Sequence, residues 1–206
     1  MTDENIQLIQ ELEKRIAYER LVAQISAMAV NLTDISAFQN ICMQLIGETT
    51  GIDRAYIFKY CYASNTVSNT HEWCAPGIEP QIDSMQKIDQ TEIAWWNDSL
   101  RKDCIIHFHD IEQIADHKVK TLLRQQNILS ILAVPLIIKD ELYGFMGFDS
   151  CKNHRLWPDE DIDLLKMVSR IISDAIAHFT VKTELIASQQ QMLSIFDSIT
   201  DPVYVA

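Results

Sequence analysis

An apolar residue recurs at every seventh position near the C-terminal end, at Leu165, Ile172, Phe179, Ile186 and Leu193. Such a repeat is typical of a helix that packs along one seam. Pro158 and the three acidic residues at 159–161 favour a helix start, because proline fits a first turn and acids interact well with the positive end of the helix dipole. We therefore expect one helix of about 40 residues, from about Asp159 to Ile199.

The two ends of the chain predict a homodimer. From about residue 180 onward the C-terminal helix has no remaining globular chain to pack on, and an isolated helix is marginal in water. Residues 5–32 contain no Gly or Pro, and Ile9, Leu12 and Ile16 follow the spacing of a coiled-coil seam. A second copy of the chain is the natural partner, so we predict a homodimer formed through the terminal helices.

A second helix and two β-hairpins are predicted between these ends. A helical pattern runs from Ile35 to Thr50, and Gly51 follows it as a left-handed stop. Aromatic and β-branched residues predict a hairpin over residues 54–74. Two apolar runs at 128–138 and 142–149 predict a second hairpin whose strands are apolar on both faces. Both faces of its sheet must therefore be covered.

The segment between the two hairpins has weaker patterns. We expect a helix around Thr91 to Lys102, a short strand at Cys104–Phe108 and another helix across His117–Gln126. The hairpins and these elements together predict an insert of helices and loops inside an otherwise antiparallel sheet.

Composition excludes several classes of protein. Hydrophobic residues make up 48% and charged residues 22%, as in soluble globular domains. Because 17 Lys and Arg stand against 29 Asp and Glu, the net charge of −12 leaves little basic surface for nucleic acid or anionic lipid. The acidic N-terminus is unlike a secretory signal, and no apolar run is long enough for membrane insertion, so we expect a cytoplasmic location. Five scattered cysteines without a CxxC pair are expected to be reduced and mostly buried.

Four stretches carry a family resemblance: Arg54–Phe58, Ile131–Leu136, Leu142–Asp149 and Trp157–Leu165. They resemble the first strand, the central hairpin and the start of the last helix of the GAF domain, a sensory module of many signalling proteins. The resemblance covers roughly residues 20–180. It implies an α+β fold, with an antiparallel sheet, the N- and C-terminal helices on one face, and a helical or loop insert over a small-molecule pocket on the other.

A second resemblance lies at the C-terminal end, where Leu193–Val205 looks like the opening of a PAS domain. We therefore divide the chain into an N-terminal signalling and dimerisation helix (1–31), the GAF domain (32–180), a linker helix (181–199) and a truncated PAS start (200–206). Together the resemblances imply a segment of a longer bacterial or archaeal sensor. PAS and output domains would follow in the same chain, the output being a histidine kinase or a diguanylate cyclase.

The function implied is sensory and not catalytic. The domain would bind an unidentified small molecule and relay the signal through the dimeric helix. Trp73, Trp95 and Trp96 are our candidates for the pocket, because ligand sites are mostly apolar and aromatic. The alternative interpretation is a dimerising spacer whose pocket is filled and takes no ligand.

Other chemistries have weaker support in the sequence. His107 and His109 are candidate metal ligands, because alternate residues of a strand share one face, but HxH lacks a compact third ligand. We find no signature of a bilin or a haem, since no Cys-His dipeptide and no Asp-Ile-Pro motif occur. Of the pattern that marks cyclic-nucleotide GAF domains, only Asp161 matches. The cofactor is therefore unknown.

A redox enzyme is the remaining alternative, because some GAF proteins reduce methionine sulfoxide with a reactive cysteine. Cys104 follows Arg101 and Lys102, and Cys151 precedes Lys152, so the sequence suggests a mildly activated thiol at either position. The clustered cysteines of those enzymes are not recognisable here. We therefore expect no enzyme activity in this segment.

Overall fold

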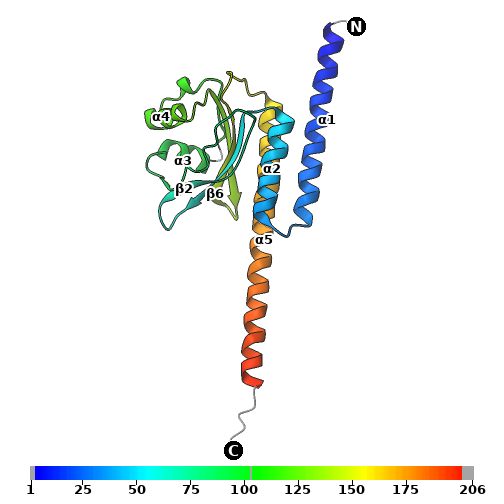
Figure 1. Cartoon of the computed structure of the whole chain (residues 1–206), viewed down its shortest axis with the longest axis vertical. Helices are drawn as coiled ribbons and strands as arrows, with labels where there is room; N and C mark the ends of the chain where they lie inside the picture. The colour runs from blue at the N-terminus through cyan, green and yellow to red at the C-terminus, as the bar shows by residue number, and fades with distance from the viewer. Residues whose placement is uncertain (1–2, 103, 201–206) are drawn as a thin grey trace, which may run out of the picture.

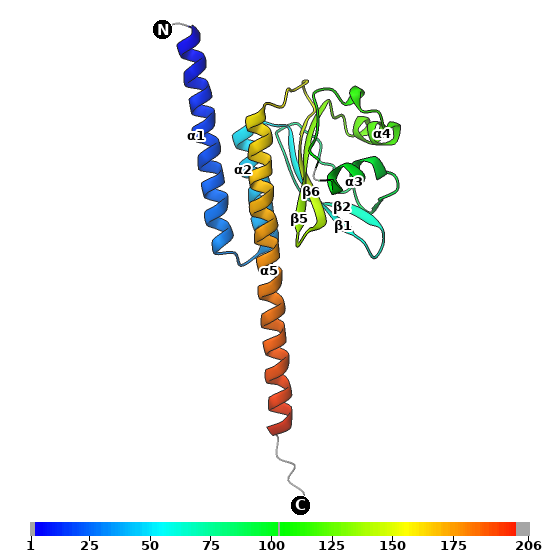
Figure 2. The same ribbon diagram turned by 180° about the vertical axis from the view of Figure 1, so that it is seen from behind.

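The computed structural model describes residues 3–102 and 104–200. Three layers make up the domain (Figures 1 and 2). Helices α1, α2 and α5 form one layer, a twisted sheet forms the second, and the insert that carries α3 and α4 forms the third. This is the α+β architecture expected from the sequence, with the terminal helices and the insert on opposite faces of the sheet.

The helical layer consists of α1 (Asp3–Val30), α2 (Ile35–Thr50) and α5 (Asp159–Thr200). The Asp34 carboxylate caps α2 by accepting hydrogen bonds from the backbone N–H groups of Ser36 and Ala37. Gly51 ends α2 with φ of 64°, a left-handed conformation that glycine adopts without strain. The expected bounds of α2 are therefore confirmed.

The sheet contains β1 (Arg54–Cys61), β2 (Thr66–Cys74), β3 (Ile88–Asp89), β4 (Ile106–Phe108), β5 (Ser130–Ile138) and β6 (Glu141–Ser150). The six described strands lie in the order β3-β2-β1-β6-β5-β4, and every neighbouring pair is antiparallel. Both predicted hairpins are confirmed. Lys139 and Asp140 form the two-residue turn between β5 and β6, and both have positive φ, as the tightest hairpin turn requires.

The insert occupies residues 75–129 and covers the sheet with α3 (Ala94–Arg101), a short 3-10 helix at Ile111–Gln113, and α4 (His117–Gln125). Each predicted element of the insert is present, with bounds that differ by at most three residues. Strand β3 was not predicted, because a strand of two residues is too short to show a period.

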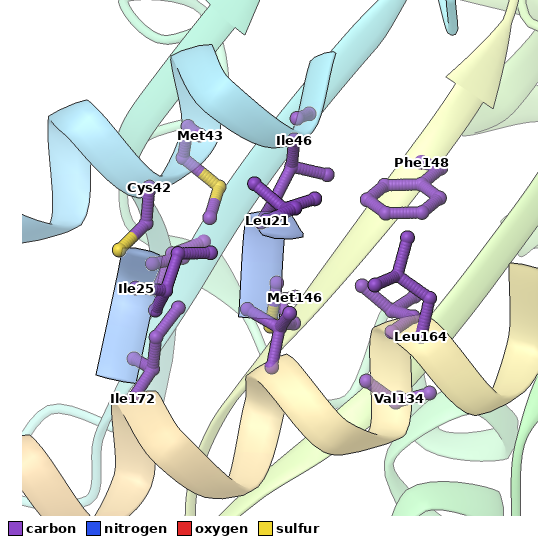
Figure 3. Close-up of a cluster of buried hydrophobic side chains, with 14 of the residues drawn as sticks. Leu21, Ile25, Cys42, Met43, Ile46, Val134, Met146, Phe148, Leu164 and Ile172 are labelled. Carbon is purple, nitrogen blue, oxygen red and sulfur yellow. The ribbon is translucent and has the colours of Figure 1, made fainter. Parts of the chain in front are cut away.

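A large apolar core lies between the sheet and the helical layer (Figure 3). It brings Leu21 and Ile25 of α1 against Met43 and Ile46 of α2 and against Ile172 of α5. Strand residues that point the other way join a second core beneath the insert. Strands β5 and β6 are thus buried on both faces, as their continuous apolar runs predict.

Helix α5 is 42 residues long, which confirms the expected single helix. Its sevenfold repeat is divided between two environments. Leu165 and Ile172 are fully buried in the core of their own domain, whereas Ile186 and Leu193 are 43% and 64% exposed. The seam read from the sequence is therefore not a free surface along the whole helix.

The two terminal helices extend past the domain in opposite directions (Figure 1). The first part of α1 projects beyond one end of the sheet, and the second part of α5 projects beyond the other. Within residues 3–102 and 104–200, no helix is both long and apolar enough to cross a membrane. The expected PAS start at 201–206 lies outside the described residues, and so does Asp103.

Candidate functional site: a cavity beneath the insert

A small cavity lies between the sheet and the insert. Its volume is about 40 Å³. The lining comes from the strands beneath it and from α3, α4 and the loops of the insert, and is mostly apolar: Phe58, Val67, Met85, Ile93, Trp96, Val119, Leu123, Ile131 and Phe145. Tyr56, Gln126 and Asp149 add polar groups. An apolar enclosure with a few converging polar groups is the usual character of a small-molecule site.

Aromatic rings make one wall of the cavity. Phe58 on β1 stacks on Phe145 on the neighbouring strand β6, with ring centroids 4.7 Å apart and planes 5° apart. Trp96 of α3 packs at an angle against Phe145, at 5.6 Å. Helix α3 is also bonded to the sheet at this wall, because Tyr60 of β1 donates a hydrogen bond of 2.6 Å to the Oδ1 of Asn97, the residue after Trp96. The insert is therefore fastened to the sheet beside the cavity.

Trp96 has an unusual feature, because its indole N–H has no hydrogen-bond partner among the described residues. The side chain is only 4% exposed, so water does not solvate it freely. A buried donor without a partner costs roughly 1–3 kcal/mol. A ligand with an acceptor atom would remove that cost.

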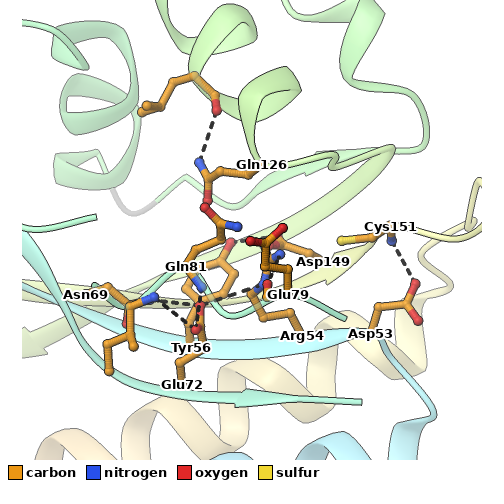
Figure 4. A network of polar contacts seen from close by, with 12 residues as sticks. Asp53, Arg54, Tyr56, Asn69, Glu72, Glu79, Gln81, Gln126, Asp149 and Cys151 are labelled. Atoms are coloured by element: carbon orange, nitrogen blue, oxygen red, sulfur yellow. Dashed lines mark hydrogen bonds and ion pairs between the residues drawn. The ribbon is translucent and has the colours of Figure 1, made fainter. Parts of the chain in front are cut away.

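A buried ion pair lies at the floor of the cavity (Figure 4). Arg54 on β1 and Asp149 on β6 are directly paired across the two strands, and Arg54 Nη1 donates to Asp149 Oδ2 at 3.0 Å. The other carboxylate oxygen accepts from Tyr56 Oη, also at 3.0 Å. The Arg54 and Asp149 side chains are 2% and 1% exposed, so the pair is screened from water.

A second carboxylate shares this arginine. Glu72 on β2 lies 3.7 Å from Arg54 Nε, and its side chain is 3% exposed. Backbone N–H groups of Gln81 and Ile82 donate to the same carboxylate, which attaches the first loop of the insert to the sheet. Arg54 also donates to the Glu79 carbonyl oxygen. Two buried carboxylates thus stand against one guanidinium.

Burial of the pair affects the pKa of Asp149, and the Glu72 carboxylate adds to the effect. Burial raises the pKa of Asp149 to about 7, although Arg54 and Tyr56 act in the opposite direction. Burial also raises the pKa of Tyr56 well above its ordinary value, and the nearby Asp149 carboxylate adds to this. Asp149 can therefore change its protonation near neutral pH, directly beside the cavity.

The three tryptophans chosen from the sequence have different positions. Trp96 lines the cavity. Trp95 packs beside it, between Trp96 and Phe108, but does not line the cavity. Trp73 is on the opposite face, where its ring packs so closely on α2 that a Cβ at Gly47 would lie 2.0 Å from it. The pocket position expected for Trp73 is therefore corrected, because its register on β2 turns it toward the helices.

His107 and His109 are both exposed, and His109 lies just beyond the end of β4. The ring of His109 lies 5.5 Å from that of His154. In the described part of the chain, no three His, Cys, Asp or Glu side chains come together as a metal site would require. The HxH pair is thus brought near a third histidine, but without a set of ligands.

The cysteines differ from the expectation that most are buried. Cys42 is buried, Cys74 and Cys151 are half-buried, and Cys61 and Cys104 are exposed. Burial raises the pKa of Cys151 to about 12, and the neighbouring Asp149 carboxylate adds to the effect. The thiol is therefore not activated by Lys152, because burial and nearby carboxylates outweigh an exposed cation.

Sequence reasoning missed the Arg54, Asp149 and Glu72 cluster. The available signal was the presence of charged residues at the ends of strands that are otherwise apolar. Since strand partners were unknown, nothing in the sequence indicated that these charges meet on one face.

Comparison with known proteins identifies the family. The GAF domain model matches residues 34–176. The chain therefore belongs to the GAF domain family, and the expected resemblance is confirmed over those residues.

Two histidine kinases are among the relatives. The methanogenesis regulatory histidine kinase FilI of Methanothrix harundinacea (strain 6Ac) is 29% identical over 191 residues, which cover 88% of this chain and 21% of that protein. The circadian input-output histidine kinase CikA of Thermosynechococcus vestitus is 23% identical over 209 residues, or 92% of this chain and 27% of that protein. The chain thus spans between a fifth and a third of the length of these relatives.

A solved structure with the same fold is the phycocyanobilin-bound GAF domain from a cyanobacterial phytochrome. Its TM-score is 0.69, at 15% identity, with 80% of this chain and 96% of that chain covered. The likeness establishes the fold alone.

Proposed function

We propose that this chain is the sensory domain of a signal-transduction protein, that it binds a small molecule beneath the insert, and that it relays binding through a homodimer of its terminal helices. The two histidine kinase relatives support a histidine kinase as the parent protein, with a diguanylate cyclase as the alternative output. The chain itself acts as the regulatory part, with PAS and output domains following in the same polypeptide.

The observation that supports ligand binding is the unpaired indole N–H of Trp96, a residue that lines a mostly apolar cavity. Asp149 lines the same cavity and carries a carboxyl group that can be protonated near neutral pH. A small molecule with an acceptor toward Trp96 and a donor toward Asp149 would satisfy both groups. The cavity size favours a ligand much smaller than a nucleotide.

A bilin does not suit these residues. A cavity of about 40 Å³ has no room for a linear tetrapyrrole, and none of its described lining residues is a cysteine that could hold one covalently. We therefore do not extend the bound chromophore of the phytochrome domain to this chain.

The relay is supported by a chain of contacts from the insert to the helices. Trp157, just before α5, donates from its indole nitrogen to the carbonyl oxygen of Phe108 on β4, at 3.2 Å. Phe108 in turn packs against Trp95 of α3. A shift of the insert would therefore reach the first turn of α5 directly.

The same end of α5 is fastened to α1. Asp161 accepts hydrogen bonds from Tyr18 at 2.7 Å and from Arg155 at 2.9 Å, and lies 2.8 Å from Lys14 Nζ. Arg155 also donates to the Thr50 carbonyl at the end of α2. Tyr18 and Lys14 thus link α1 to Asp161 of α5, and Arg155 links the end of α2 to the same carboxylate.

Native mass spectrometry of freshly purified protein tests the proposal. We expect a dimer with an adduct that is lost on denaturation. Trp96→Phe should lower adduct occupancy, because it removes the donor but keeps an aromatic ring. Trp95→Phe is the matched control and should leave occupancy unchanged, since Trp95 does not line the cavity. Equal loss in both variants would contradict a role for the Trp96 N–H.

The second candidate function is a dimerising spacer without a ligand. The small volume of the cavity favours it, because 40 Å³ holds only a few water molecules. A dimer without any adduct, and with Trp96→Phe at least as stable as the native chain, would support the spacer.

A further inference from the structure

A continuous surface runs along the outside of α5 that differs from the sevenfold seam. We name it the outer stripe and define it by eight residues that alternate in steps of four and three: Met167, Ile171, Asp174, His178, Val181, Leu185, Ser188 and Met192. It spans residues 167–192 of α5, a helix that starts beside the domain and projects beyond it (Figure 2). A step of three or four corresponds to a repeat of 3.5 residues, the period of a two-stranded coiled coil.

Most of the outer stripe is accessible, although Ile171 is half-buried against the domain core. Met167 beside the domain is 49% exposed, and Val181, Leu185 and Met192 farther along are 49%, 58% and 57% exposed. The sevenfold seam is different, since Leu165 and Ile172 are taken up by the domain core. The outer stripe therefore keeps exposed side chains both beside the domain and beyond it, where another helix can meet them.

We propose that two copies of this chain pair in parallel through the outer stripes of their α5 helices. This inference rests on the proposed homodimer and names the surface and direction of pairing. The repeat supports a second helix of the same kind as the occupant, because a globular partner would not require a 3.5-residue period over 25 residues. An α5 helix without such a partner would leave its projecting part unsupported.

The positions of the helix ends favour parallel pairing. The projecting parts of α1 and α5 lie at opposite ends of the domain (Figure 1). Both carry exposed apolar side chains, among them Ile9 and Leu12 on α1 and Leu185 on α5. Parallel alignment places like ends side by side, whereas antiparallel alignment through α5 would leave the projecting α1 helices at distant ends.

Three residues of the outer stripe are polar, and two of them, Asp174 and His178, are complementary. Asp174 and His178 are both exposed and lie one step apart. In a parallel pair, His178 of one chain lies in the layer next to Asp174 of the partner subunit and can donate a hydrogen bond to it. A charged and hydrogen-bonding step of this kind in a mostly apolar stripe favours a single register, because most other registers would set Asp174 and His178 against apolar side chains.

Disulfide crosslinking distinguishes the two surfaces with neighbouring residues. In a background with the exposed Cys61 and Cys104 changed to Ser, Leu185→Cys and Met192→Cys should each form covalent dimers on mild oxidation. Ile186→Cys and Leu193→Cys are the matched controls, because they are also exposed but belong to the sevenfold seam. We expect several-fold more crosslinking at the two outer-stripe positions.

Equal or stronger crosslinking at 186 and 193 in a dimeric protein would overturn the outer stripe and leave the homodimer intact. The Leu185→Cys chain can also be mixed with chains that carry His178→Cys or Met167→Cys. If it crosslinks only to those chains and not to itself, the pairing is antiparallel and the proposed direction is overturned. A monomer by light scattering of the native chain would overturn both this inference and the proposed homodimer. Leu185→Glu, compared with Ile186→Glu, provides a second measurement and should weaken the dimer much more.

Discussion

Two buried aspartates on opposite sides of the sheet have pKa values shifted in opposite directions. Burial raises the pKa of Asp149 to about 7. Burial would also raise the pKa of Asp161, but hydrogen bonds from Lys14, Tyr18 and Arg155 hold it below the ordinary value. Both side chains are only 1% exposed, but Asp149 is packed more deeply, so its carboxylate loses more of its hydration.

The charges around the two groups add to this difference. Asp149 shares its one cation, Arg54, with the Glu72 carboxylate. Asp161 lies between two cations, Lys14 and Arg155, and receives a hydroxyl hydrogen bond as well. A buried carboxylate thus stays ionised when nearby cations and hydrogen-bond donors outweigh the cost of burial, and is readily protonated when they do not. Asp161 on the helix side therefore stays ionised, whereas Asp149 on the cavity side can change its charge near neutral pH.

The largest expected effect is the loss of the shared cation. Arg54→Met should destabilise the fold by about 3–5 kcal/mol in urea unfolding, because it leaves two buried carboxylates without a counter-charge. Arg101→Met is the control, since Arg101 is half-exposed and its pair with Asp98 is 4.0 Å long. A loss at Arg54 no larger than that at Arg101 would contradict the buried ion pair.

Removing the charge of Asp161 should destabilise the fold less than the loss of Arg54. We expect Asp161→Asn to lose about 2–3 kcal/mol at neutral pH, because Lys14 and Arg155 are partly exposed and can regain water. The native contribution is present above pH 3.8 and is lost as the pH falls through the lowered pKa of Asp161. Urea unfolding against pH should therefore show a smaller loss for this variant in acid, and a constant loss would contradict the assignment.

The pH dependence on the cavity side should have the opposite sign. Because the folded pKa of Asp149 is raised, its contribution to stability is fully present below pH 3.8 and is lost as the pH rises through about 7. Asp149→Asn should remove most of this pH-dependent change in the free energy of unfolding, which amounts to about 2–3 kcal/mol between about pH 5 and 8. Unfolding curves of the two proteins between about pH 5 and 8 would measure it, and parallel curves would argue against a titrating Asp149.

The smallest effects should come from the two tyrosine hydroxyls. Tyr18→Phe and Tyr56→Phe should each cost about 1 kcal/mol, since each removes one hydrogen bond to a buried carboxylate. Only Tyr56→Phe should raise the pKa of Asp149 further. Infrared titration of the protonated carboxyl band would separate the two, because Tyr18→Phe should leave that midpoint unchanged.

The elements of this domain could be predicted closely because each depends on neighbours in the sequence. Asp34 and Gly51 mark the ends of α2, and the apolar runs of β5 and β6 indicate strands covered on both faces. The candidate site could be predicted only in part. Trp96 lines the cavity, but Trp73, chosen for the same reason, faces the helices. Composition identifies an aromatic residue without indicating which face of the sheet it will occupy.

Sequence alone determined the order of elements, the family resemblance and the length of α5, because periodicity, caps and turns act over a few residues. Tertiary structure decided which charges meet and which helix face stays exposed. Arg54 and Asp149 are 95 residues apart, and Tyr18 and Asp161 are 143 apart, so only the packed sheet and helices join them. The seam of α5 was divided for the same reason, since burial depends on what packs against a helix as well as on its repeat.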